Sequence, residues 1–126
     1  MRAVGITDSI VNFYEIHETE NSVYMVLEYL GGGELLRRMS SKKKYGEQFI
    51  RKLMLKILSG LFHCHKLGIM HRDLKPENLM LIDKKKIFSV KIIDFGLATF
   101  IDVDKYLFGR CGTPGYVAPE IILQKN

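Results

Sequence analysis

The stretch of sequence that decides the fold of this chain is His71-Arg72-Asp73-Leu74-Lys75-Pro76-Glu77-Asn78. Two further signatures follow it, Asp94-Phe95-Gly96 and then Ala118-Pro119-Glu120. Each signature alone says little, because a single Asp in a polar loop is usually a turn former and a single Asn is usually a cap. Their order along one chain of 126 residues predicts a shared functional site.

The composition is that of a globular protein or of part of one, with 47% hydrophobic and 26% charged residues. Cys64 and Cys111 have neither the spacing of a metal site nor that of a disulfide framework. The sequence has no apolar run of about eighteen residues, and residues 1–8 lack the apolar core of a signal peptide. We therefore expect a cytoplasmic or nuclear protein with no membrane partner.

The net charge of +5 is concentrated in one segment, residues 34–56. Eight basic and two acidic residues give this segment +6, against −1 for the rest of the chain. No groove-reading motif accompanies it, so a solvated helix face is favoured over a nucleic-acid surface. Lys42 to Lys44, within it, are expected to form a solvated connection.

Residues 10–17 and 23–30 are rich in β-branched and aromatic residues and are separated by the polar residues 18–22. This pattern predicts an antiparallel hairpin. The glycines at 31–33 end the second strand, and a short helical turn is expected from Glu34 to about Met39, with the acid at its positive end.

The segment that begins at Glu47 predicts the one long helix, roughly 30 Å at about 1.5 Å per residue. Gly68 is a suitable left-handed stop for it. Apolar residues recur there at every fourth position and are expected to form one broad buried stripe: Phe49, Leu53, Ile57 and Leu61, flanked by Ile50, Met54, Leu58 and Phe62. His63, Cys64 and His65 are better explained as packing or surface residues than as ligands.

Two short apolar runs, 79–82 and 87–93, follow the first signature and are joined by residues 83–86. They predict a second hairpin that places Asp94 at its end. From residue 96 to residue 115 the pattern loses clear periodicity, as is usual for a long functional loop.

Together the three signatures resemble the catalytic loop, the magnesium-binding turn and the end of the activation segment of a eukaryotic protein kinase. The resemblance implies an α+β fold, a partial kinase domain over residues 1–126. Residues 1–27 correspond to the end of the β-rich small lobe, 28–33 to the hinge, and 34–126 to the first half of the helical lobe.

The resemblance also implies ATP and Mg²⁺ as cofactors, since kinases act chiefly by positioning the reactants and neutralising phosphate charge. Asp73 would orient the substrate hydroxyl or accept its proton, and Lys75 would stabilise the transferred phosphate. Asn78 and Asp94 would hold magnesium through oxygen ligands. His71 and Phe95 correspond to packing residues of the regulatory spine.

Lys75, two places after Asp73, and Gly112-Thr113-Pro114 resemble the pattern of serine/threonine-specific kinases. The implied substrates are therefore Ser or Thr hydroxyls of proteins. Thr113 is expected to line the catalytic site beside Asp73 and Lys75, although read alone it is an ordinary turn threonine.

Glu28-Tyr29-Leu30 resembles the hinge, where backbone groups of Glu28 and Leu30 bond adenine and Leu27 is the gatekeeper. Glu34 and Met80 are assigned to the same nucleotide site by this resemblance. The glycines at 31–33 are not a phosphate loop, because they lack the G-x-G-x-x-G spacing and follow the hinge.

Glu34 and Glu77 stand where basophilic kinases place acids that pair with arginine, so we hypothesise a preference for Arg three residues before the acceptor. Ordinary surface acids are the alternative reading. With the segment 111–120, these acids make the calcium/calmodulin-dependent kinases the nearest resemblance. A calmodulin-type regulator, acting through regions outside this chain, is an implied partner.

The chain departs from the kinase pattern at both ends. Nothing upstream of the hinge supplies the Gly-rich loop, the third-strand lysine or its glutamate partner, and Lys91 does not replace that lysine because it follows the catalytic loop. Glu120 should pair with an arginine further downstream than this chain reaches. We therefore expect little or no kinase activity from residues 1–126 alone, and a tendency to aggregate.

The activation segment departs as well, since Gly109 stands where a phosphorylatable Thr is expected and Arg72 then lacks a phosphate partner. Control by another segment or partner, and activity without phosphorylation, both fit this pattern. The rival function is a non-catalytic binding or dominant-interfering module derived from a kinase.

Overall fold

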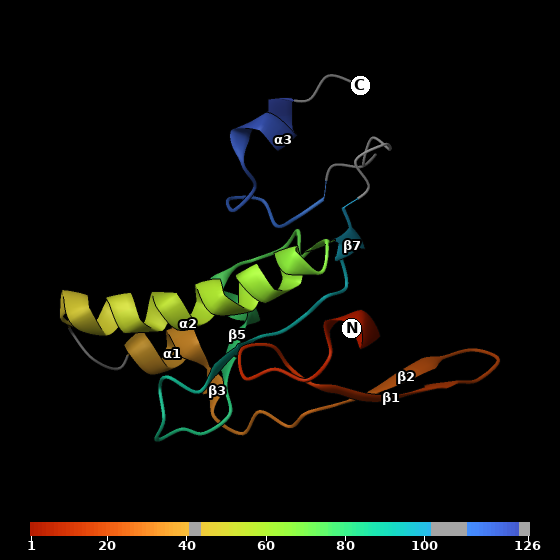
Figure 1. Ribbon diagram of the computed structural model, residues 1–126, viewed down its shortest axis with the longest axis horizontal. Helices are drawn as coiled ribbons and strands as arrows, with labels where there is room; N and C mark the ends of the chain where they lie inside the picture. Colours follow the sequence, from red (N-terminus) through yellow and green to blue (C-terminus); the bar gives the residue numbers. More distant parts are fainter. Residues whose placement is uncertain (41–43, 102–110, 124–126) are drawn as a thin grey trace.

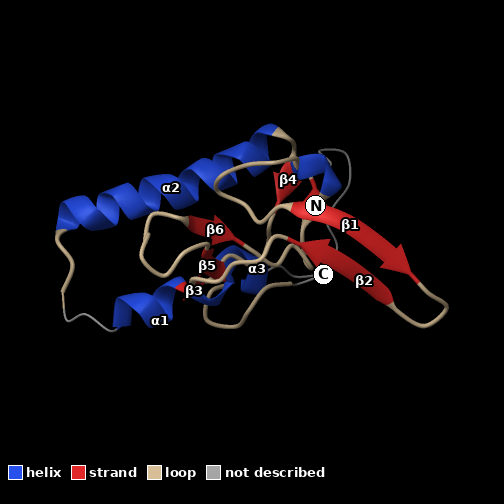
Figure 2. Cartoon of the chain, turned by 90° about the horizontal axis from the view of Figure 1, so that it is seen from below, coloured by secondary structure: helices blue, strands red, loops and turns tan. Residues whose placement is uncertain are grey.

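The computed structural model describes residues 1–40, 44–101 and 111–123. Its elements in chain order are η1 Arg2–Val4, β1 Phe13–Glu18, β2 Val23–Leu27, β3 Gly33–Glu34, α1 Leu35–Ser40, α2 Glu47–Lys66, β4 Ile69–Met70, η2 Pro76–Asn78, β5 Leu79–Leu81, β6 Val90–Ile92, β7 Thr99–Phe100 and α3 Pro119–Leu123. Helix α2 lies over the three-stranded sheet β3-β5-β6, and the β1–β2 hairpin extends away from them (Figure 1). Seen from below, α1 and the β1–β2 hairpin lie on opposite sides of the molecule (Figure 2). This mixture of helices and antiparallel strands agrees with the expected α+β class.

The first hairpin is confirmed, with shorter strands than expected. β1 and β2 pair antiparallel, with Ile16 opposite Met25, and all of β2 is exposed. Ile10 and Val11 were predicted to start the first strand, but they lie buried beside β6, where the Val11 N–H donates to the Ile92 carbonyl at 3.0 Å. Their β-branched side chains belong to the core and not to the hairpin.

The glycines at 31–33 do more than end a strand. The Gly32 N–H donates to the Leu81 carbonyl at 2.8 Å, and Gly33 has a φ of 74°. Glu34 then pairs with Met80 as part of β3, so helix α1 begins at Leu35, one residue later than predicted. The glycines therefore bring the chain against β5 before the helix starts.

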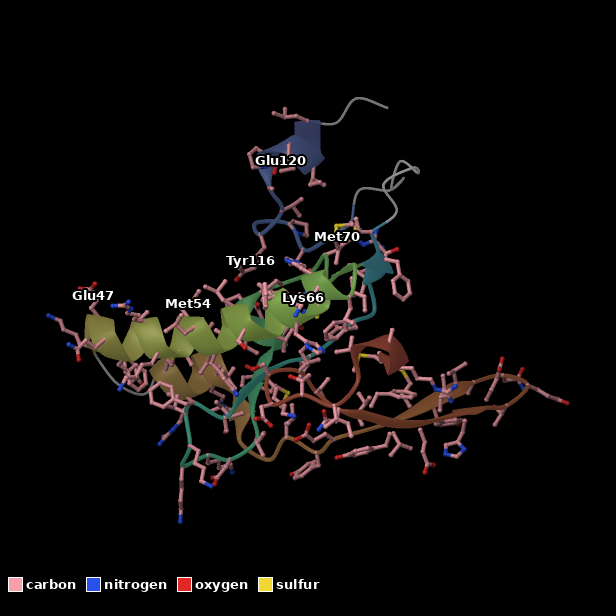
Figure 3. All side chains as sticks on the ribbon, viewed as in Figure 1. Glu47, Met54, Lys66, Met70, Tyr116 and Glu120 are labelled. Carbon is pink, nitrogen blue, oxygen red and sulfur yellow. The ribbon has the colours of Figure 1, made fainter. Side chains whose placement is uncertain are left out.

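Helix α2 is confirmed from Glu47 to Lys66, and Gly68 has the expected left-handed φ of 67°. Leu53 and Ile57 are buried in one core cluster, with Leu35, Leu79, Leu81, Val90 and Ile92. The prediction of one broad buried stripe is wrong for one side of the helix, where Met54, Leu58 and Phe62 are 44%, 50% and 64% exposed. The strands that contact α2, β4 and β6, cover only its other side, and Met54 lies on the side of the helix away from α1 (Figure 3).

A second cluster forms near the end of α2 from Val4, Ile10, Cys64 and Ile69. Burial raises the pKa of the Cys64 thiol. The His63 ring nitrogen Nε2 lies 2.7 Å from the Val4 carbonyl, to which it donates, while His65 is exposed. These contacts confirm that His63 and Cys64 are packing residues and that His65 is a surface residue.

The second hairpin is also confirmed, as β5 and β6 pair antiparallel with Met80 opposite Lys91. Asp94 follows two residues after β6 ends. None of the helices in the described ranges has both the length and the apolarity needed to cross a bilayer. The predicted connection at Lys42 and Lys43 lies outside the described residues, as do Gly109 and Arg110.

Candidate functional site

The loop from His71 to Asn78 connects β4 to β5, and His71 holds it in place. The backbone N–H of Asp73 donates to His71 Nδ1 at 3.2 Å, so the carbonyl of Ile93 accepts from His71 Nε2 at 2.9 Å. Because an N–H only donates and a carbonyl only accepts, these contacts require the neutral ring protonated at Nε2. The ring of His71 also meets that of Phe95 edge-on at 4.7 Å. His71 therefore fixes the His71–Asn78 loop against the segment that carries Asp94.

Two backbone conformations mark the same loops. Arg72 and Asp94 have φ values of 65° and 59°, and they are the only non-glycine residues with positive φ in the described part of the chain. Such conformations cost free energy and concentrate at functional sites. The Arg72 side chain donates through Nε to the Leu97 carbonyl at 2.6 Å.

Asp73, Lys75 and Thr113 form a closed triangle of hydrogen bonds. The Thr113 hydroxyl donates to Asp73 Oδ1 at 2.7 Å, and Lys75 Nζ donates to Thr113 Oγ1 at 2.6 Å. Lys75 Nζ also lies 2.8 Å from Asp73 Oδ2, in an ion pair that is largely buried. Thr113 is 40 residues from Asp73 in sequence, and the fold brings it to the predicted place.

The triangle sets the protonation states of its charged members. The hydrogen bonds from Lys75 and then Thr113 lower the pKa of Asp73 to about 2, and the Asp73 carboxylate raises the pKa of Lys75. At neutral pH the pair is therefore a carboxylate and an ammonium. A carboxylate of such low pKa accepts a proton poorly, so the arrangement favours orientation of a hydroxyl over full removal of its proton in the ground state.

Asn78 and Asp94 are the predicted magnesium ligands. Asn78 donates through Nδ2 to the Asp73 carbonyl at 2.9 Å, which leaves its amide oxygen as the atom that could bind a cation. Asp94 is exposed, and its Oδ1 accepts the Gly96 N–H at 3.1 Å. The described residues contain no group of three or more His, Cys, Asp or Glu side chains placed to hold a metal. Magnesium is usually bound by one or two carboxylates together with substrate phosphates, so this donor set fits it.

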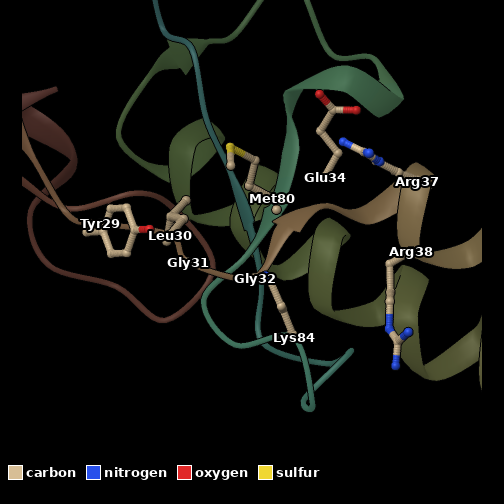
Figure 4. A pocket seen from close by; sticks show the side chains of 10 residues that line it. Tyr29, Leu30, Gly31, Gly32, Glu34, Arg37, Arg38, Met80 and Lys84 are labelled. Atoms are coloured by element: carbon tan, nitrogen blue, oxygen red, sulfur yellow. The ribbon is translucent and has the colours of Figure 1, made fainter.

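A pocket of about 700 Å³ lies beside the predicted hinge (Figure 4). Its walls include Leu30, Glu34 and Met80, three of the four residues predicted for the nucleotide besides Asp94. Tyr29, the glycines at 31–33, Arg37, Arg38 and Lys84 complete it. Met80 lies on β5, two residues after Asn78, so this strand leads from the His71–Asn78 loop to the pocket.

Glu28, the fourth of these residues, is not part of the pocket wall. Its carboxylate contacts Lys91 Nζ at 2.6 Å. The prediction for Glu28 concerned its backbone groups, of which the N–H donates to the Asn12 carbonyl at 2.9 Å. Lys91 was missed as a partner of the hinge. The available signal was its position in the apolar strand Val90-Lys91-Ile92, whose three residues are all buried.

Three predicted acids remain: Glu34 in the pocket wall, Glu77 beside Asn78 in η2, and Glu120 on α3. Glu34 and Glu77 are exposed, as a role in binding a cationic substrate requires. Glu120 is exposed on α3, well separated from α2 (Figure 3). Its pairing with a downstream arginine stays a prediction.

Comparison with known proteins identifies the family. The family model described as "Protein kinase domain" matches residues 1–126. A protein named "Probable serine/threonine-protein kinase 2" from Plasmodium falciparum (isolate K1 / Thailand) is 48% identical over 113 residues, 90% of this chain and 22% of the relative. "CBL-interacting protein kinase 26" from Oryza sativa subsp. japonica is 39% identical, over 94% of this chain and 24% of the relative.

A third relative comes from the group that the sequence resembles. It is named "Calcium/calmodulin-dependent serine/threonine-protein kinase 1", also from Oryza sativa subsp. japonica, and is 43% identical over 90% of this chain and 19% of the relative. The chain spans about a fifth to a quarter of the length of these relatives. The family generally uses ATP and Mg²⁺. Because the family model matches residues 1–126, the whole of this chain, the chain belongs to the protein kinase domain family, and its relatives are named serine/threonine kinases.

Proposed function

We propose that these residues carry the catalytic loop and the hinge of an ATP-dependent protein serine/threonine kinase. The observation that supports this best is the triangle of Asp73, Lys75 and Thr113, since it combines a hydroxyl-orienting carboxylate with a cation held beside it. By the division that the sequence predicts, residues 1–27 belong to the small lobe, 28–33 to the hinge and 34–126 to the helical lobe.

The proposed chemistry follows from the charges of the triangle. The Asp73 carboxylate accepts a hydrogen bond from the Ser or Thr hydroxyl of the substrate and holds its oxygen toward the phosphate. Lys75, held 2.8 Å from Asp73 Oδ2, offsets the negative charge that the transferred phosphoryl oxygens bring to the site. Thr113 keeps both side chains in register, because its hydroxyl bonds to each.

The nucleotide is proposed to span from the pocket to Asp94. Leu30 and Met80 supply apolar walls for adenine. The hinge hydrogen bonds would come from the backbone of Leu30 and from the carbonyl of Glu28, since the Glu28 N–H donates to Asn12. Asn78 and Asp94 would hold Mg²⁺, which neutralises and bridges phosphate oxygens when bound. Asn78 contributes twice, since its nitrogen also anchors the Asp73 carbonyl.

The first test is binding of ADP to residues 1–126, with and without Mg²⁺, measured by NMR titration. We expect Mg²⁺ to tighten ADP binding, and we expect Asp94→Asn to remove that gain while leaving adenosine binding unchanged. Asp83→Asn in the β5–β6 loop is the matched control, because it makes the same change at another loop carboxylate. Equal ADP affinity for wild type and Asp94→Asn, at every Mg²⁺ concentration, would contradict the assignment of Asp94.

The second test concerns turnover. We propose that residues 1–126 alone phosphorylate a peptide slowly or not at all, because the parts that hold the β- and γ-phosphates in kinases are not matched in this sequence. Robust magnesium-dependent phosphorylation by the purified 126 residues would refute that proposal. Loss of any residual activity in Asp73→Asn would tie it to the triangle.

The substrate preference is proposed from Glu34 and Glu77. Both are exposed, and carboxylates bind the planar guanidinium of Arg in bidentate fashion. A peptide library tested on an active form of the kinase should favour Arg three residues before the acceptor. Equal turnover with Ala at that position would exclude the preference. A calmodulin-type regulator is proposed by analogy with the related kinase named for calmodulin.

A binding module remains the second candidate function, and one observation favours it. Met54, Leu58 and Phe62 present an apolar face on α2, and large exposed apolar surfaces often mark interaction sites. An immunoblot with an antibody against residues 47–66 separates the two functions. A single band at 14.5 kDa favours the module, and a band well above that mass favours a larger kinase.

A further inference from the structure

Lys91 is a buried cation in the middle of strand β6. Only 3% of its side chain is exposed, and its ammonium lies 2.6 Å from Glu28 Oε2. The same ammonium donates to the Thr7 carbonyl at 2.9 Å, and Glu28 Oε2 also accepts the Asn12 N–H at 3.1 Å. One ion pair thus joins the N-terminal segment, the end of β2 and strand β6.

Packing alone does not account for this pair. Lysine is almost never fully buried unless it is paired, and a buried ion pair is often no more stabilising than apolar side chains of the same volume. A Met side chain at position 91 would occupy a similar volume, and its burial would not carry the free-energy cost of removing a charge from water. The best-attested use of such buried polar groups is to fix one arrangement of segments among several.

The segments that this pair joins are those of the proposed nucleotide site. Glu28 lies two residues before Leu30, whose side chain lines the pocket. Lys91 lies three residues before Asp94 in sequence, and the Ile93 N–H donates to the Asn78 carbonyl at 2.9 Å. The proposed hinge is therefore held by the ion pair to strand β6, which leads to Asp94, and the residue after β6 is bonded in turn to Asn78.

We propose that the Lys91–Glu28 ion pair is a positioning clamp, which sets the hinge at a fixed distance from Asp94 so that adenine and the magnesium-bound phosphates engage the protein together. This inference rests on the proposed function, because it assumes nucleotide binding. It predicts that the clamp couples the two ends of the ligand, so its loss weakens MgADP binding more than adenosine binding.

The test compares MgADP and adenosine affinity by NMR titration in four proteins: wild type, Lys91→Met, Glu28→Gln, and the double variant Glu28→Gln/Lys91→Met. We expect the ratio of the two affinities to fall about tenfold in each variant, a value typical of coupling between sites. Lys85→Met, a lysine in the exposed β5–β6 loop, is the matched control and should keep the wild-type ratio.

The double variant separates positioning from folding. Each single change leaves one buried charge unpaired and should lower the urea midpoint, whereas the double change removes both charges and should recover part of it. If the clamp only stabilises the fold, the affinity ratio follows the urea midpoint and recovers with it. A wild-type ratio in the double variant would therefore overturn the proposal.

A measurement on wild type removes the dependence on any one variant. Adenosine has no phosphates, so protection of the Gly96 amide from hydrogen exchange by adenosine reports coupling from the hinge to the Asp94 turn. We expect this protection in wild type and in Lys85→Met; its absence in wild type would overturn the clamp. A wild type that binds neither ADP nor adenosine would instead refute the proposed function itself, and the clamp with it.

Discussion

Alanine substitution along the glycines at 31–33 should give three different costs, because each glycine is required for a different reason. A Cβ at Gly32 would lie 2.5 Å from both the Cβ and the carbonyl oxygen of Leu81. A Cβ at Gly33 would meet nothing within 4 Å, but the φ there is 74°. A Cβ at Gly31 would lie 3.0 Å from a ring carbon of Tyr29, whose side chain is 88% exposed and free to move.

The magnitudes follow from these contacts. Gly32→Ala must push β3 from β5, and overpacking costs about 1–3 kcal/mol. It also strains the 2.8 Å hydrogen bond from Gly32 to Leu81, with about 0.5–1.5 kcal/mol at stake. We expect a total of about 2–4 kcal/mol. Gly33→Ala should cost about 1 kcal/mol, the left-handed penalty less the gain from a stiffer unfolded chain.

Gly31→Ala should change the free energy of unfolding by less than about 0.5 kcal/mol, because the close neighbour of its Cβ is an exposed ring that can turn aside. Pulse proteolysis across a urea series measures all three, because it reads the folded fraction on a gel at concentrations too low for aggregation. The expected order of cost is Gly32, Gly33, Gly31. If Gly32→Ala were no more destabilising than Gly31→Ala, the close contact between Gly32 and Leu81 of β5 would be contradicted.

Three further predictions concern the core, the end of helix α2 and the Asp73 carboxylate. Leu81→Ala, at a fully buried position, should lower the free energy of unfolding by about 2–5 kcal/mol, whereas Leu55→Ala on the exposed side of α2 should cost far less; urea midpoints compare them. Gly68→Ala should cost about 1 kcal/mol in the same assay, because its φ is 67° and a Cβ there meets no atom. The pKa of Asp73 is lowered from 3.8 to about 2, so its contribution to stability is complete above about pH 4 and is lost as the pH falls toward 2. Lys75→Met should raise this pKa and shrink the acid-dependent loss; an unchanged carboxyl titration by NMR would show that Lys75 is not the main cause.

Local patterns in the sequence predict the long elements well. Helix α2 follows from its apolar period and its glycine stop, and the β5–β6 hairpin follows from two apolar runs with a charged turn. The same rules assigned Ile10 and Val11 to the first hairpin, because a run of β-branched residues looks alike whether it pairs in a hairpin or packs beside another strand. They also overestimated the buried face of α2, since periodicity identifies apolar positions but not which of them another element covers.

The candidate site divides in the same way. Asp73, Lys75 and Asn78 are close in sequence, and Thr113 was placed beside them only through the family resemblance, since spacing alone says nothing of a contact across 40 residues. The bond between Lys91 and Glu28 spans 63 residues and has no motif, so it emerged only from the fold. Contacts of this kind depend on the global arrangement of the chain, which single-sequence patterns do not encode.

The docking of the N-terminal segment beside β6 has a consequence for synthesis on the ribosome. The Ile92 N–H donates to the Ser9 carbonyl, the Val11 N–H donates to the Ile92 carbonyl, and Ile10 bridges to Ile92 across 82 positions of sequence. At about 5–20 residues per second, roughly 4–16 s pass between translation of these two ends. During that interval the segment lacks the β6 backbone that holds it in place, so a nascent chain leaves it accessible to chaperones, and codons that slow translation before Ile92 would lengthen that exposure.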